Sequence, residues 1–142
     1  MTRIVRGCLW LSVIVAGLAL RQFGPGFGLS FPVVKYGGSI LWGTMVFFCV
    51  AIIASGRPRW TVALMSAAIA VGVELFRLVH TPWLDDFRLT TLGALLLGRV
   101  FSPRNMLAYG AGIVLGMVLD RLGTAAFTKA GRSARDASHS AS

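Results

Sequence analysis

Residues 62–80 form an apolar stretch of membrane-spanning length that carries Glu74 and Arg77 close to its end. A span needs about 20 consecutive apolar residues, and each ionisable side chain inside it costs roughly 2.5 to 3.5 kcal/mol on insertion scales. Such charges are retained where other polar groups pair with them or shelter them. The pattern therefore predicts a membrane helix whose charged end faces protein or a polar pocket.

The composition of the whole chain is that of a small integral membrane protein. Of its 142 residues, 56% are hydrophobic and 13% are charged, which predicts one transmembrane domain over 1–122. Residues 123–142 are rich in Ser, Ala and basic side chains, and we expect a disordered cytoplasmic tail there. Cys8 and Cys49 lie in apolar runs without the spacing of a disulfide framework or a metal site, and no cofactor is predicted.

The net charge of +9 points to lipid rather than to nucleic acid. The basic residues punctuate the apolar segments instead of gathering on a polar domain that could present them to nucleic-acid phosphates. The expected partner is the lipid bilayer, with anionic head groups as the counter-charge.

Hydropathy predicts an all-α polytopic membrane bundle of four spans plus one shorter helix. The spans lie near 7–20, 38–54, 60–80 and 106–119, and the first also fits a cleaved signal peptide. Residues 21–35 hold five Gly and Pro residues and are interpreted as a loop. Residues 89–101 are too short to cross and predict a re-entrant helix, which requires cover from protein or a watery cavity beside the third span.

Charge asymmetry favours four crossings over five. With four crossings and both termini in the cytoplasm, eight basic residues lie inside and five outside, whereas five crossings give six inside and seven outside. The positive-inside rule prefers the first arrangement.

Small residues predict the faces along which the spans pack. The third span has one seam of small residues followed by charges, made of Ala63, Ala67, Ala70, Glu74, Arg77 and Thr81. Small residues let helices approach closely in lipid, so this seam should be buried against another span. On the last span, Ala108, Gly112 and Gly116 share a face and include a GxxxG pair, which is a packing device.

Glu74 and Arg77 are the first candidate site residues, and their positions allow two interpretations. They line a polar pocket that binds a charged head group or small solute, or they form a salt bridge at (i, i+3) that fastens the helix to its neighbour. Asp86, Arg88 and Thr91 follow in the polar link over 81–88 and the start of the next helix.

Arg88 has a functional and a plain interpretation. Together with the free amides of a helix N-terminus it forms an anion site, or it is a snorkelling arginine beside a simple cap. Lys35, Tyr36 and Trp42 are either anchors at the outer interface or the opposite wall of the same pocket. His80, Asp85 and Asp86 lack recognisable ligand spacing, and no metal site is predicted.

Several segments together resemble a known family. They are KYGGSILW at 35–42, ELFRL at 74–78, WLDDFRLTTLG at 83–93 and LG at 97–98. Over roughly 17–119 the chain resembles the bacterial membrane family known as domain of unknown function 2809, and it is more loosely similar to the VanZ-like membrane proteins. The resemblance implies a bacterial inner-membrane protein and no established reaction. The family pattern tends to have an acid where Ser39 stands and a glutamine where Arg77 stands.

The residues favour a non-enzymatic membrane protein that binds or moves a lipid-linked or small anionic ligand through an intramembrane polar pocket. The alternative is a structural or accessory subunit of an envelope complex, or a homo-oligomer, with Ala108, Gly112 and Gly116 as the contact face. An enzyme is the third option, since His80 with Asp85 or Asp86 could act as an acid-base pair. No Ser-His-Asp arrangement, HExxH or phosphate loop occurs in the sequence.

Overall fold

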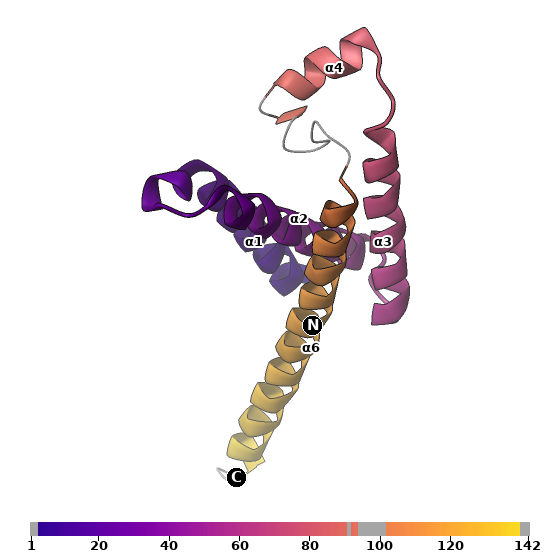
Figure 1. Cartoon of the computed structure of the whole chain (residues 1–142). Coiled ribbons are helices and arrows are strands. Elements are labelled where there is room, and N and C mark those ends of the chain that lie inside the picture. The colour runs from indigo at the N-terminus through magenta and orange to yellow at the C-terminus, as the bar shows by residue number, and fades with distance from the viewer. Residues whose placement is uncertain (1–2, 91, 94–101, 140–142) are drawn as a thin grey trace.

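In the computed structural model, which describes residues 3–90, 92–93 and 102–139, every regular element is a helix (Figure 1). Four helices are long and apolar enough to cross a membrane, and this confirms the predicted all-α architecture with four spans. The predicted re-entrant helix over 89–101 falls mostly outside the described residues. The elements are α1 (Arg3–Phe23), the 3-10 turn η1 (Pro25–Phe27), α2 (Phe31–Ile53), α3 (Arg59–Phe76), α4 (Pro82–Leu89) and α6 (Pro103–His139).

Glycine and proline set the helix ends in the first half of the chain. Gly28 and Gly56 have φ values of 75° and 103°, which L side chains rarely adopt, and they close the connections before α2 and before α3. Pro32 lies in the first turn of α2, where no amide donor is needed. Because α1 continues to Phe23 and α2 begins at Phe31, the loop predicted over 21–35 is shorter than expected.

Polar contacts fix the directions of the helices. Arg59 at the start of α3 bonds to Asp120 of α6, and Glu74 at the end of α3 bonds to Ser102 just before α6 begins, so α3 and α6 are antiparallel. We refer to these two ends of the bundle as the Asp120 end and the Glu74 end. The chain leaves α3 and returns to α6 at the Glu74 end, which agrees with four crossings rather than five.

Helix α2 is central, because it contacts each of the other three long helices. Phe47 and Phe48 are fully buried, and they pack with Val62 of α3 and Ile113 of α6 in the apolar core. The outward faces carry exposed large hydrophobic side chains, as expected where acyl chains replace water. Examples from α3 and α6 are Leu64, Ile69, Leu107, Val114 and Val118.

Glycine allows α2 and α6 to approach closely and in parallel. A Cβ atom added at Gly112 would overlap the Ile40 carbonyl oxygen, and one at Gly116 would lie 2.6 Å from the Phe47 ring. The buried Thr44 hydroxyl donates to the Gly112 carbonyl across this contact at 2.8 Å. The Gly112 and Gly116 face is therefore covered by α2 within the chain.

Two segments have more helix than the sequence predicted. The segment 81–88, interpreted as a polar link, is mostly helical: α4 covers Pro82–Leu89, with Pro82 in its first turn and Leu84 and Arg88 buried. Helix α6 runs to His139, so residues 123–139 are helical rather than the expected disordered tail. Ala, Lys and Arg in this segment favour a helix. Figure 1 shows α4 beyond the end of α3 and the last turns of α6 extending past the other helices.

The close α2–α6 contact can be tested by adding a single methyl group. We expect Gly112→Ala to lower stability by about 1 to 3 kcal/mol, because the new Cβ forces the two backbones apart. Gly110→Ala is the control, since its Cβ meets open space and alanine favours the helix. Thermal unfolding in detergent micelles measures the difference, and equal melting temperatures for the two variants would contradict the close contact.

Candidate functional site

Glu74 lies fully buried near the end of α3, and both of its carboxylate oxygens are engaged. Oε2 accepts a hydrogen bond from Arg77 Nη1 at 2.6 Å, and Oε1 accepts one from the Ser102 backbone amide at 2.7 Å. The pair at (i, i+3) on one helix is therefore also tied to the start of α6. Glu74 has its counter-charge and a backbone donor within the protein, as a buried carboxylate requires.

The other terminal nitrogen of Arg77 reaches α6. Arg77 Nη2 donates to the Tyr109 hydroxyl at 2.8 Å, and its guanidinium lies 5.9 Å from the centre of that ring. Tyr109 is only 3% exposed, and its ring packs on Trp42 of α2 at 4.7 Å between centroids. One charged network thus joins α2, α3 and α6.

Arg88 holds α4 against the end of α3. Its guanidinium donates to the carbonyls of Val79 and Phe76 at 2.8 and 2.7 Å, and to Asp85 Oδ1 at 3.1 Å. Phe76 is the last residue of α3 and Val79 lies just beyond it, so Arg88 donates to carbonyls at the point where this helix ends. At 2% exposure it is a buried cap of α3 rather than a cation presented to an anion.

The remaining candidate residues that the structure describes, apart from Trp42, lie outside the Glu74 network. Asp86 is exposed, and it is Asp85 that contacts Arg88 and lies 3.3 Å from His80 Nδ1. Lys35 is exposed near the start of α2, with its ammonium 5.5 Å from the Tyr36 ring. Thr91 lies outside the described residues. Of the proposed opposite wall, only Trp42 reaches the network, through Tyr109.

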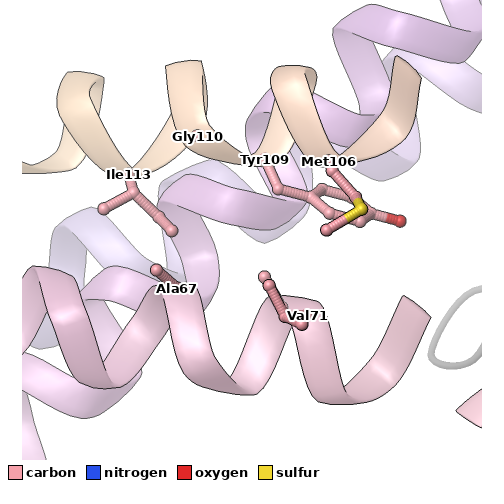
Figure 2. A pocket seen from close by; sticks show the side chains of 7 residues that line it. Ala67, Val71, Met106, Tyr109, Gly110 and Ile113 are labelled. Carbon is pink, nitrogen blue, oxygen red and sulfur yellow. The ribbon is translucent and has the colours of Figure 1, made fainter. Parts of the chain in front are cut away.

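An apolar groove of about 110 Å³ lies between α3 and α6 beside this network. Figure 2 shows Ala67 and Val71 of α3 across from Tyr109 and Ile113 of α6. The exposed Gly110 and Val71 belong to its wall, so the groove opens toward the lipid-facing side of the bundle. The cavity predicted beside the third span was a watery one with charged walls, whereas this groove is lined by apolar and small side chains: Ala67, Ala70, Val71, Met106, Tyr109, Gly110 and Ile113.

Comparison with known protein families identifies the family of this chain. A family model described as "Protein of unknown function (DUF2809)" matches residues 30–113. The chain belongs to this family. The similarity to VanZ-like proteins stays a prediction, and no solved structure matches the chain. The range that matches DUF2809 contains Glu74, Arg77, Tyr109 and every residue of the groove.

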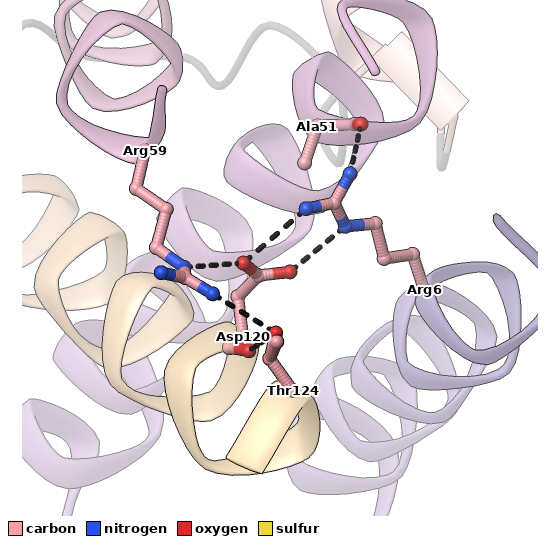
Figure 3. Close-up of polar contacts among 5 residues, drawn as sticks. All are labelled: Arg6, Ala51, Arg59, Asp120 and Thr124. Atoms are coloured by element: carbon pink, nitrogen blue, oxygen red, sulfur yellow. Dashed lines mark hydrogen bonds and ion pairs between the residues drawn. The ribbon is translucent and has the colours of Figure 1, made fainter. Parts of the chain in front are cut away.

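A second buried carboxylate of this DUF2809 chain lies beyond the matched range. Asp120 of α6 is fully buried and accepts hydrogen bonds from Arg6 Nε at 2.8 Å and Arg59 Nε at 2.7 Å (Figure 3). Arg6 also donates to the Ala51 carbonyl at 2.9 Å, and Arg59 to the Thr124 hydroxyl at 2.9 Å. This cluster joins all four spans at the end opposite Glu74.

Sequence reasoning did not find the Asp120 cluster or Tyr109. Arg6 and Arg59 entered only as topology signals, and Asp120 only as the end of a span. One signal was available: the chain has five acidic residues, and an acid at the basic end of a bundle is expected to meet arginine. Tyr109 had no comparable signal, because its partner Arg77 follows a different helix, and the alignment of that helix with α6 cannot be read from the sequence.

The Glu74–Arg77 pair predicts a large cost for breaking it on one side. Arg77→Ala leaves the Glu74 carboxylate buried without its counter-charge, and we expect a loss of about 3 to 5 kcal/mol. The double variant Glu74→Gln with Arg77→Met removes both charges and should lose less. Thermal unfolding in micelles compares them, with Arg104→Ala as an exposed control. An Arg77→Ala protein that melts with the Arg104→Ala control would show that the pair is not buried.

Proposed function

We propose that this protein binds a lipid or a lipid-linked ligand in a bacterial inner membrane, with the apolar chain of the ligand in the α3–α6 groove. The observation that supports this most directly is the position of Tyr109. Its ring lines the groove, while its hydroxyl belongs to the buried network with Glu74 and Arg77. A groove with an apolar wall and one polar end matches a molecule with an apolar chain and a polar head.

The shape of the groove favours an elongated apolar occupant that enters sideways. Ala67, Ala70 and Gly110 leave space where larger side chains would close the contact between the helices. A Cβ built at Gly110 meets nothing within 4 Å. Because the surroundings of this face are acyl chains, a lipid reaches the groove without crossing water.

The charged network supports the ligand indirectly. Both oxygens of Glu74 accept hydrogen bonds from protein groups, and Arg77 is engaged by Glu74 and Tyr109. We therefore assign the pair to holding Tyr109 and closing the groove at its polar end.

Exposed cations near the same end are the better candidates for an anionic head group. They are Lys35 of α2 and Arg104 of α6. The contact of Ser39 with Asn105 at 3.5 Å brings these two helix starts together.

Filling the groove tests the proposal. Gly110→Leu places a side chain in the groove, and Gly72→Leu is the matched control, because Gly72 is also an exposed helical glycine with open space but does not line the groove. The probes are a phospholipid with a photoreactive acyl chain and a polyprenyl phosphate with a photoreactive isoprenoid chain. We expect Gly110→Leu to reduce cross-linking of at least one probe to α3 and α6 several-fold, while Gly72→Leu labels like the parent.

The location of the cross-links decides the result. Labelling at Met106 or Val71 that disappears in Gly110→Leu supports the groove. Equal labelling of Gly110→Leu and Gly72→Leu with both probes would overturn the proposal. Lipids that merely surround the protein would label both variants to the same extent, whereas a lipid bound in the groove would not.

A further inference from the structure

The Asp120 end carries a dense group of arginines around one carboxylate. Among the described residues it holds Arg6 and Arg59, which bind Asp120, together with exposed or partly exposed Arg3, Arg57 and Arg121. Five positive charges against one negative charge leave an excess of four. We refer to these six residues as the basic end.

The carboxylate of Asp120 has little capacity left for further cations. Arg6 Nε bonds to Oδ1, Arg6 Nη2 reaches Oδ2 at 3.3 Å, and Arg59 Nε bonds to Oδ2. The side chain of Arg59 nevertheless remains 40% exposed. The two arginines and their shared acid therefore still present a net positive charge at the surface.

Arg3 and Arg57 lie beside this cluster at the turn between α2 and α3. Arg3 donates from both Nε and Nη2 to the neutral Ser55 hydroxyl, at 2.9 and 2.5 Å, so its charge is not balanced by that contact. Arg57 follows Ser55 by two residues and is exposed, next to Gly56 with its φ of 103°. Two guanidinium groups with unbalanced charge thus flank one tight turn.

The apolar neighbours of these arginines indicate what kind of anion fits. Ile4 and Ile53 are each 78% exposed and Trp60 is 62% exposed, and all three lie at the Asp120 end. Apolar side chains left uncovered beside arginines are unfavourable in water, but they suit the boundary between head groups and acyl chains. A free phosphate ion or a nucleic acid would leave them uncovered.

We propose that the basic end binds the phosphate of an anionic phospholipid, with Arg3 and Arg57 as its main ligands and Ile4, Ile53 and Trp60 against the acyl chains. Guanidinium groups bind phosphate through charge-assisted hydrogen bonds, and basic pockets between transmembrane helices bind anionic head groups on the cytoplasmic side. The positive-inside rule places this end in that leaflet. The site is at the opposite end of α3 from the polar end of the groove and does not depend on the proposed function.

The test measures lipid enrichment with charge-matched variants. The protein is reconstituted in nanodiscs of phosphatidylcholine with a minor fraction of phosphatidylglycerol, and retained lipid is counted by native mass spectrometry. Arg3→Gln with Arg57→Gln is compared with Arg21→Gln with Lys129→Gln, which removes two exposed basic side chains that do not belong to the basic end. We expect about a fivefold loss of phosphatidylglycerol enrichment per arginine in the first pair and little change in the second.

Each alternative outcome is distinct. An equal loss in both double variants would overturn the proposal, because it shows a response to net charge alone. Displacement of the retained lipid by inorganic phosphate would also overturn it in favour of a free-anion site. A normal helical spectrum and melting temperature for Arg3→Gln with Arg57→Gln excludes misfolding, and neither arginine contacts Asp120.

Discussion

The arrangement of this bundle depends on two carboxylates that are fully buried at opposite ends of the α3–α6 pair. Glu74 and Asp120 are each 0% exposed, and each must find its counter-charge inside the protein. Glu74 takes an arginine from its own helix and an amide from the start of α6, whereas Asp120 takes arginines from α1 and α3. Because both ends must be satisfied at once, α3 and α6 have one register in which the pairs form.

Between these ends the bundle is held by shape rather than by charge. The α2–α6 contact uses glycine to bring the backbones together, and Thr44 adds a hydrogen bond to the Gly112 carbonyl. The α3–α6 contact is looser, since small residues there are not matched by large ones and the groove remains. Helix α6 therefore packs tightly against α2 and loosely against α3, and the groove lies on its loosely packed side.

The amino-acid sequence was sufficient to predict those features that depend on composition or on neighbours within one helix. Hydropathy located four spans, and the salt bridge that the structure shows between Glu74 and Arg77 is one of the two interpretations that their (i, i+3) spacing allowed. The same (i, i+3) spacing pairs Arg88 with Asp85 rather than with Asp86. It could not be applied from the sequence, because the polar composition of 82–89 did not indicate a helix. The contacts of Tyr109 and Asp120 could not be predicted, because they depend on how distant helices are aligned.

The contacts between α2 and α6 near Tyr109 are made by neutral side chains, beginning with Ser39. Its hydroxyl faces Asn105 of α6 at 3.5 Å, one turn before Tyr109, and Trp42 follows one turn later on α2. The cation and the acid of this layer are Arg77 and Glu74, and both come from the α3 segment, with Arg77 directly after its last helical residue. The outer part of α2 is consequently joined to α6 by neutral contacts, and a neutral hydrogen bond contributes only about 0.5 to 1.5 kcal/mol. At this level the charged contacts with α6 therefore come from the α3 segment, and α3 and α6 are the two helices that form the groove.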